Sequence, residues 1–217
     1  MSPFSISKPL YQQAYEEIKK SILTGAIPLG SKIIASQLAE KYQISRTPLR
    51  EALRQLQNEG LLIPEQNGFA VIELNRNEFE DLCDCRLVLE KKLMEIITGN
   101  IADVQLQEIE NVLNETENAI NENDLLQILS HNAQFHQILM DCCPNKHLVQ
   151  LLEHVRSLML IYRANINKNP DPEIVNEHKQ IFHALKEQNR EKVQQLIENH
   201  LENDRIRGTK VLDEYES

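Results

Sequence analysis

One stretch decides how the first part of this chain folds: Ser45-Arg46-Thr47-Pro48-Leu49-Arg50-Glu51-Ala52-Leu53-Arg54-Gln55-Leu56. Its apolar side chains recur with the period of one helix face. They are Leu49, Ala52, Leu53 and Leu56. Three arginines lie on a different face: Arg46, Arg50 and Arg54. The pattern therefore predicts a helix with one face built for a core and another that suits an anion.

Residues at both ends of this stretch fit the limits of a helix. Ser45 can cap the helix by accepting a hydrogen bond from a free N–H of the first turn. Pro48 lies within that turn, where a missing donor is tolerated. Gly60 supplies the stop, because glycine adopts the left-handed conformation after a helix without a steric penalty.

The neighbouring segments decide how the arginine stripe is interpreted, since such a stripe alone is more often an ordinary solvated face. A second short helix is expected just upstream, over residues 35–42, with a tight turn at Gln43-Ile44. That is the order of a helix-turn-helix, with the arginine helix in the recognition position. Downstream, apolar runs flank Asn67-Gly68, the strongest short hairpin signal, so a two-stranded wing is expected. Lys32-Ile33-Ile34 adds a strand that pairs with it.

Several fixed spacings here resemble the winged helix-turn-helix of the GntR family of bacterial transcription regulators, over roughly residues 8–73. The matching segments are Gly25-Ala26-Ile27-Pro28-Leu29-Gly30, Gln37-Leu38-Ala39, residues 45–53 and Glu59-Gly60-Leu61. Two positions depart from the family pattern. Gln43 stands where the family usually has a glycine in the turn, and Ala35 stands where an acidic residue is common. The resemblance implies double-stranded DNA as a partner.

The DNA contacts implied by the resemblance come from both helices and the wing. Arg46 and Arg50 are expected to reach base edges or phosphates in the major groove. Contacts with the DNA backbone or the minor groove are expected from four further residues: Ser36, Ser45, Thr47 and Gly68.

Composition limits the class of protein. The 217 residues are enough for two domains, each with its own core. No apolar run approaches the length of a membrane span. The start, Met1-Ser2-Pro3-Phe4-Ser5, lacks the basic and apolar regions of a signal peptide. We therefore expect a cytoplasmic protein with no membrane partner.

Charge is divided unevenly along the chain, whose formal net charge is −10. Residues 1–73 carry eight Lys and Arg against seven Asp and Glu, whereas residues 74–217 carry 15 against 26. The near-neutral first part can dock on DNA while the acidic second part faces away from phosphate. An architectural protein that wraps DNA would need extensive positive surface, so that class is disfavoured.

The texture changes after Leu74, where glycine nearly disappears and long amphipathic segments follow. Six helices are predicted, at residues 76–98, 104–122, 124–141, 147–166, 172–187 and 190–213. Breaks such as Cys143-Pro144-Asn145 and Asn169-Pro170 separate them. Short connections between six helices imply an antiparallel bundle. The expected fold is mostly α, with a winged helix-turn-helix domain over residues 1–74 and an all-helical domain over residues 75–217.

Three histidines lie on three different helices of this second domain: His136, His178 and His200. A single histidine on an apolar face is more often a core or surface group than a metal ligand. Three that face inward could instead converge in the bundle interior, which is where such folds build metal sites.

The second part of the chain resembles the FCD effector-binding domain of FadR-type GntR regulators, over roughly residues 76–213. Four features carry this resemblance: Arg86 with Glu90, Phe135-His136, His178 and His200. It implies a divalent metal, zinc or similar, a small carboxylate effector bound by Arg86, and a homodimer. Arg86 has a second interpretation, in which it pairs with Glu90 one turn on and does nothing else.

Asn132 stands where the family has an aspartate metal ligand. It lies one turn before His136, so both residues share a helix face. A neutral amide oxygen is a weaker ligand for a divalent cation than a carboxylate. Two alternatives follow: His136, His178 and His200 bind the metal less tightly, with Asn132, water or effector completing the site, or the pocket binds its effector without metal.

Two function classes fit these residues unequally. The first is a homodimeric, ligand-responsive transcription regulator, a repressor, whose two-fold symmetry predicts an inverted-repeat operator. The alternative is a metal-dependent enzyme that uses the three-histidine site. The sequence offers that enzyme no general base beside the ligands, no nucleophile motif and no phosphate loop. The enzyme also leaves the wing and the arginine helix unexplained, so no enzymatic activity is expected.

Overall fold

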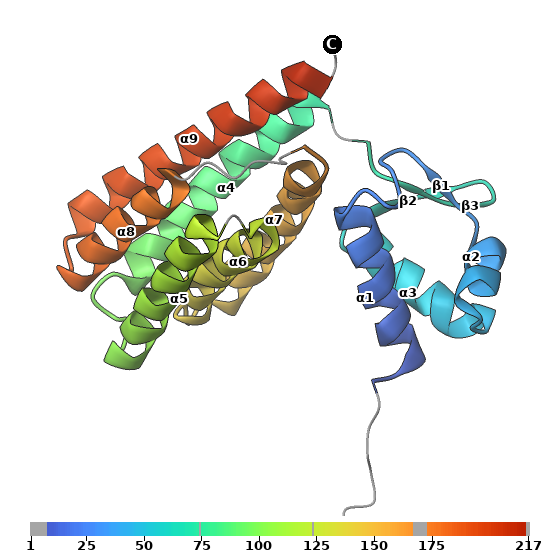
Figure 1. Ribbon diagram of the computed structural model, residues 1–217, viewed down its shortest axis with the longest axis horizontal. Coiled ribbons are helices and arrows are strands. Elements are labelled where there is room, and N and C mark those ends of the chain that lie inside the picture. The colour runs from blue at the N-terminus through green and yellow to red at the C-terminus, as the bar shows by residue number, and fades with distance from the viewer. Residues whose placement is uncertain (1–7, 74, 123, 167–172, 216–217) are drawn as a thin grey trace, which may run out of the picture. The chain divides into compact units, whose positions relative to one another are not determined.

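The computed structural model describes residues 8–73, 75–122, 124–166 and 173–215 (Figure 1). These residues are mostly helical with one small sheet, which confirms the expected fold class. The chain divides into two compact units, Met1–Asn75 with Ser157–Asn165, and Arg76–Arg156 with Ile166–Ser217. The two units have separate hydrophobic cores.

The first unit combines short helices with a sheet. Its elements are α1 (Leu10–Leu23), β1 (Lys32–Ile33), α2 (Ala35–Tyr42), α3 (Arg46–Asn58), β2 (Leu62–Glu65) and β3 (Gly68–Val71). The strands are antiparallel in the order β1-β3-β2. The predicted helix-turn-helix, its wing and the extra strand that pairs with the wing are therefore all confirmed.

Helix α3 buries the predicted apolar stripe completely, with Leu49, Ala52, Leu53 and Leu56 at 0% exposure. The stripe packs against α1, which buries Ala14, Ile18 and Ile22. Burial of each large aliphatic side chain contributes about 1.5–3 kcal/mol, so this contact holds α3 in place. The predicted Ser45 cap is wrong in its mechanism. Ser45 occupies the N-cap position, but its side chain makes no capping hydrogen bond and is exposed.

The turn between α2 and α3 forms with Gln43 at the position where the sequence resemblance led us to expect glycine. Gln43 has the left-handed backbone conformation, with φ 54° and ψ 39°. The N–H groups of Gln43 and Ile44 donate to the Glu40 and Ala39 carbonyls at 3.2 and 3.1 Å. The turn therefore forms, but the side chain of Gln43 makes the left-handed backbone conformation sterically unfavourable.

The wing turn is short because Pro64 and Glu65 belong to β2 and not to the connection. Glu65 pairs with Gly68, which leaves only Gln66-Asn67 between the strands. Gly68 has φ 152°, and a Cβ atom there would lie 2.4 Å from the Ile33 carbonyl oxygen. Glycine is thus required here by the close approach of β1.

Within its described residues, the second unit contains five whole helices and part of a sixth, because Ser157–Asn165 belong to the first unit (Figure 1). They are α4 (Arg76–Ile97), α5 (Asp103–Asn121), α6 (Leu125–Asp141), α7 (Lys146–Ile166), α8 (Glu173–Lys186) and α9 (Arg190–Tyr215). Every described end lies within two residues of its predicted position. The predicted break at Asn169-Pro170 and the predicted helix start at residue 172 lie outside the described residues.

Helices α4 and α9 form a long antiparallel pair. Arg76 at the start of α4 bonds to Asp213 near the end of α9, and Lys91 further along α4 bonds to Glu198. Gly208 permits the close approach of Phe79, whose ring a Cβ atom at position 208 would strike. This pair and α8 place buried polar groups from three helices next to one another.

Candidate DNA interface and candidate metal centre

The arginine face of α3 is available to an anionic partner. Arg46, Arg50 and Arg54 are all exposed. Among the described residues, none of the ion pairs or hydrogen bonds involves any of these three guanidinium groups. Their charges are therefore not neutralised within the fold, as contact with phosphates or base edges requires.

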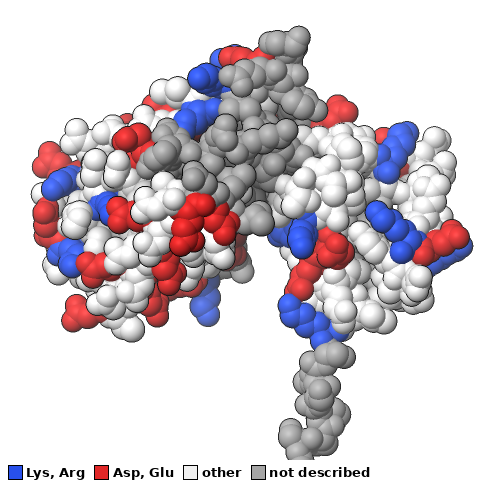
Figure 2. Space-filling view, viewed as in Figure 1, with Lys and Arg blue, Asp and Glu red and all other residues white. Residues whose placement is uncertain are grey.

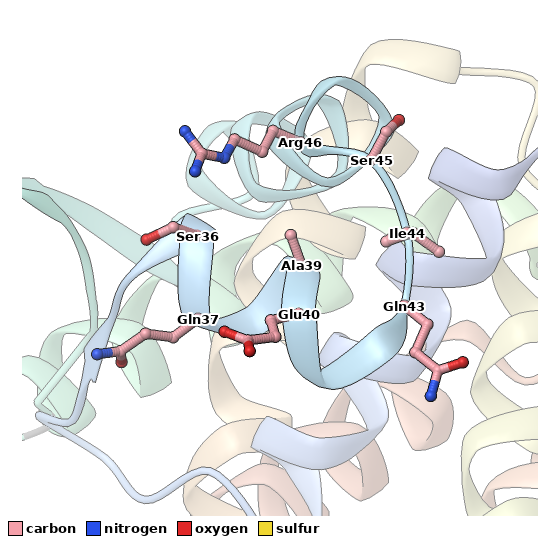
Figure 3. Close-up of a pocket in the computed structure, with 8 residues that line it drawn as sticks. All are labelled: Ser36, Gln37, Ala39, Glu40, Gln43, Ile44, Ser45 and Arg46. Atoms are coloured by element: carbon pink, nitrogen blue, oxygen red, sulfur yellow. The ribbon is translucent and has the colours of Figure 1, made fainter.

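Three of the predicted DNA-contacting residues line one open pocket between α2 and α3: Ser36, Ser45 and Arg46 (Figure 3). In this view Ser36 and Arg46 extend to the same side, while Gln43 points away. Thr47 and Arg50 are exposed on α3 but do not line this pocket. Gly68 stands apart from the pocket, at the start of β3.

Charged side chains cover the visible face of the second unit, where Asp and Glu are prominent (Figure 2). Lys and Arg are mixed with these acidic residues on this face, and the excess of acidic residues in the second part is known from the sequence counts. The second unit offers phosphate little attraction on this face, which leaves the first unit as the part suited to DNA.

Three of the seven histidines in the second unit converge in its interior. They come from α6, α8 and α9, and each is at most 2% exposed. One potential ligand atom from each ring lies within 4.8 Å of the other two. These residues are His136, His178 and His200. The sequence left open whether they meet, and the fold brings them together.

Aromatic contacts and buried ring nitrogens characterise this histidine cluster. The Phe135 ring stacks on His178, with centroids 4.1 Å apart and an interplanar angle of 14°. Nε2 of His136 and Nε2 of His200 are buried, and no described group hydrogen-bonds to either. Burial lowers the pKa of His136 well below its ordinary value, and the nearby Arg156 charge lowers it further. Buried imidazole nitrogens such as Nε2 of His136 and Nε2 of His200 are the kind of ligand atom that zinc takes, so the three histidines fit a divalent metal.

The carboxylate of Glu177 links His200 to Arg207 and Asn203. Nδ1 of His200 is 2.6 Å from Oε2 of Glu177. Arg207 donates to both carboxylate oxygens of Glu177, at 2.9 and 3.0 Å, and Asn203 donates to Oε1 at 2.8 Å. Burial alone would raise the pKa of Glu177, but the hydrogen bonds from His200 and Arg207 outweigh it and hold the pKa at about 2.

Arg86 lies in a second buried group that adjoins the cluster. It donates from Nε to Glu90 at 2.6 Å and from Nη1 to Asp204 at 2.7 Å. Arg156 donates to the same Glu90 oxygen at 2.9 Å. Burial would raise the pKa of Glu90, but the charges of Arg86 and Arg156 hold it below its usual range. The expected Arg86–Glu90 pair exists, and Asp204 is an added partner that the sequence did not indicate.

One nitrogen of the Arg86 guanidinium is left without a hydrogen bond within the described part of the chain. Its Nη2 is buried and has no hydrogen-bond partner among the described groups. A guanidinium edge left in this state suits a carboxylate oxygen.

Asn132 lies on α6 one turn before His136, as expected, and its side chain is half-buried. Its share in a metal site stays a prediction.

Sequence reasoning missed the groups that support the histidines and Arg86. Glu177 directly precedes His178, and Asp204 and Arg207 follow His200 at helical spacing. Their spacing from the histidines was the only sequence feature that could have indicated their role. Charged residues on a helix are usually solvated, however, and their burial depends on packing between distant segments.

Comparisons with known proteins agree with this architecture. Residues 10–71 match the gntR family of bacterial regulatory proteins, and residues 81–203 match the FCD domain. The HTH-type transcriptional regulator YdhC of Bacillus subtilis is 34% identical over 99% of this chain and 98% of its own length. The gluconate operon transcriptional repressor of Bacillus licheniformis is 24% identical over 81% of this chain and 75% of its own length.

A solved structure shares the fold at low identity. Escherichia coli McbR/YncC superposes with a TM-score of 0.81 and 21% identity, covering 97% of this chain and 100% of that protein. Across the described residues, none of the helices combines the length and the apolar character that a bilayer crossing needs. The family matches and the relative that is similar over nearly its whole length decide the assignment. This chain belongs to the GntR family of DNA-binding transcription regulators and carries an FCD domain after its winged helix-turn-helix.

Proposed function

We propose that this protein is a cytoplasmic homodimeric repressor whose helical unit binds a small carboxylate metabolite with the help of a divalent metal, and thereby controls DNA binding. One observation carries the proposal. Among the described groups, Nε2 of His136, Nε2 of His200 and Nη2 of Arg86 are buried without hydrogen-bond partners, and they belong to one connected set of buried residues. Buried polar groups without partners are rare in folded proteins and call for an explanation, which a bound metal and anion supply.

The metal would be held by His136, His178 and His200. Three imidazoles suit zinc, which leaves a fourth position open to water, an effector oxygen or Asn132. When bound, the metal would supply a positive charge that attracts an anionic effector. No chemical step follows, because the proposed role of the site is recognition.

The effector would present its carboxylate to Nη2 of Arg86. The other donors that Arg86 uses are engaged by Glu90 and Asp204, so the guanidinium is fixed before the effector arrives. A fixed donor loses little conformational freedom on binding, which favours affinity. The repressor role has support from the relative named as a gluconate operon transcriptional repressor.

The DNA-binding surface would comprise Arg46 and Arg50 for base edges or phosphates. Contacts with the DNA backbone would come from Ser36, Ser45 and Thr47, and Gly68 at the wing would approach phosphate or the minor groove. One recognition helix buries too little surface for tight specific binding, so two copies are expected on an inverted-repeat operator.

Selection of genomic fragments by the purified protein tests the proposal and supplies the operator. On that operator, Arg46→Ala and Arg50→Ala should each weaken binding by about 1–3 kcal/mol, which is roughly 5–150-fold. Arg54→Ala is the matched control on the same helix and should have a smaller effect. Unchanged affinity in both test variants would remove these residues from the interface.

The effector arm uses the same operator complex and a panel of small carboxylic acids, with and without zinc. At least one acid should release the DNA, and Arg86→Lys should blunt this release because lysine lacks the planar fork. Release by none of the acids, or equal release from the Arg86→Lys variant, would contradict the effector assignment.

A further inference from the structure

We infer that Glu177 is a positioning residue that holds His200 in the one neutral tautomer whose Nε2 can bind a metal. The inference rests on the proposed metal site for its purpose, although the tautomer itself is a property of the chain without metal. Glu177 lies outside the expected ligand set and acts only through His200.

The first step is the direction of the hydrogen bond. The carboxylate of Glu177 accepts two hydrogen bonds from Arg207 and one from Asn203. An ionised carboxylate can only accept, so the contact of 2.6 Å with Nδ1 of His200 requires the proton on that nitrogen. In a neutral imidazole the other nitrogen, Nε2, then carries a lone pair.

The second step is where that lone pair lies. His200 is 1% exposed, and its Nε2 is buried without a hydrogen-bond partner among the described groups. The ring packs against two further imidazoles, with centroids 5.6 Å from His136 and 4.7 Å from His178. A buried lone pair in this cluster is placed to coordinate a cation, and the carboxylate behind the ring raises its basicity.

The third step is the rigidity of Glu177 itself. Arg207 grips both carboxylate oxygens and also donates to Asp204 at 2.9 Å. Asp204 in turn holds Arg86 at 2.7 Å. Glu177 therefore cannot rotate away from His200 without breaking its two hydrogen bonds with Arg207, which is itself held by Asp204. Such support from outside the ligand set typically accounts for 10–100-fold in metal affinity.

The test compares Glu177→Gln with Glu202→Gln in the full-length protein. Both variants lose one negative charge, but Glu202 is exposed on α9, where its carboxylate lies 3.5 Å from Nε of Arg205. Ring-nitrogen NMR of ¹⁵N-histidine protein without metal, at mildly alkaline pH, reports the tautomer. The His200 signals are assigned by their absence from His200→Gln. Zinc affinity is measured by competition with a chromophoric chelator.

We expect wild type and Glu202→Gln to show His200 protonated on Nδ1 alone. Glu177→Gln should populate the other tautomer, because an amide can donate as well as accept, and should bind zinc about 10–100-fold more weakly. Unchanged tautomer in Glu177→Gln would overturn the inference, even if zinc binding falls. If wild type binds no zinc, the metal proposal fails while the tautomer comparison still decides the role of Glu177.

Asn203→Ala provides a second route if Glu177→Gln does not fold. Asn203 is exposed and donates one hydrogen bond to Glu177, so its removal loosens the carboxylate without leaving a buried charge. A smaller shift of the tautomer in the same direction is expected. A spectrum identical to that of wild type would count against Glu177 as the positioning group.

Discussion

Arg86 on α4 and Asp204 on α9 form a buried ion pair, with Nη1 of the arginine 2.7 Å from Oδ2 of the aspartate. Their side chains are 3% and 6% exposed. The pair ties the two longest helices of the second unit together beside the histidine cluster. It also fixes the arginine that the proposed effector would meet.

Asp204→Ala should lower the free energy of unfolding by about 3–5 kcal/mol, because it leaves a buried guanidinium without one of its partners. The matched control is Asp213→Ala. Asp213 also pairs with an arginine of α4, Arg76, but that pair is exposed and should contribute little. Denaturant unfolding of both variants gives the comparison. Equal effects of the two substitutions would show that burial of the Arg86 pair does not matter.

The sequence predicted what depends on local periodicity. The stripe on α3 and the six helices predicted for residues 76–213 follow from the spacing of neighbouring apolar residues, and both are present. The ion pair of Arg86 with Asp204 joins residues 118 positions apart, and Glu177 meets His200 across 23 positions. Those partners depend on how helices pack, which the pattern along one helix does not contain. The sequence and the family resemblance pointed to the three histidines, but neither pointed to Glu177, Asp204 or Arg207, which support the site residues.

Gln43→Gly should stabilise the first unit by roughly 0.5–1 kcal/mol, because it relieves the left-handed strain at φ 54°. The offsetting cost is the greater freedom of glycine in the unfolded chain. Gln37→Gly is the control, since it makes the same replacement within α2 and should destabilise by about 1 kcal/mol. In thermal unfolding, the midpoint temperature should rise for Gln43→Gly and fall for Gln37→Gly. A loss of stability in both variants would show that Gln43 is not strained.

Gly208→Ala should destabilise the pairing of α4 with α9 although alanine is the better helix former. A Cβ atom there would lie 2.1 Å from Cζ of the buried Phe79 ring, so one helix must shift. Overpacking of this kind costs about 1–3 kcal/mol. Adding Phe79→Leu should recover part of the loss, because the shorter side chain vacates the space. Denaturant unfolding that finds Gly208→Ala as stable as wild type would rule out this tight contact.

Asn132→Asp separates a metal-bound pocket from a metal-free one. If the histidine cluster holds zinc, the aspartate adds an anionic ligand on the same helix face as His136 and should tighten zinc binding by about tenfold, or 1.4 kcal/mol. If the pocket works without metal, the added charge near Arg86 should instead weaken the response to a carboxylate effector. Zinc and effector titrations of wild type and Asn132→Asp therefore distinguish the two arrangements. Tighter zinc binding by the variant supports the metal-bound pocket, and a weaker effector response supports the metal-free one.

The metal content of the purified protein after dialysis against zinc tests the proposed site most directly. Elemental analysis should find one zinc per chain in wild type and almost none in His178→Ala. His183→Ala, an exposed histidine on the same helix, should keep the metal. Wild-type protein that retains no zinc, or His178→Ala that retains as much as wild type, would contradict a metal centre formed by His136, His178 and His200.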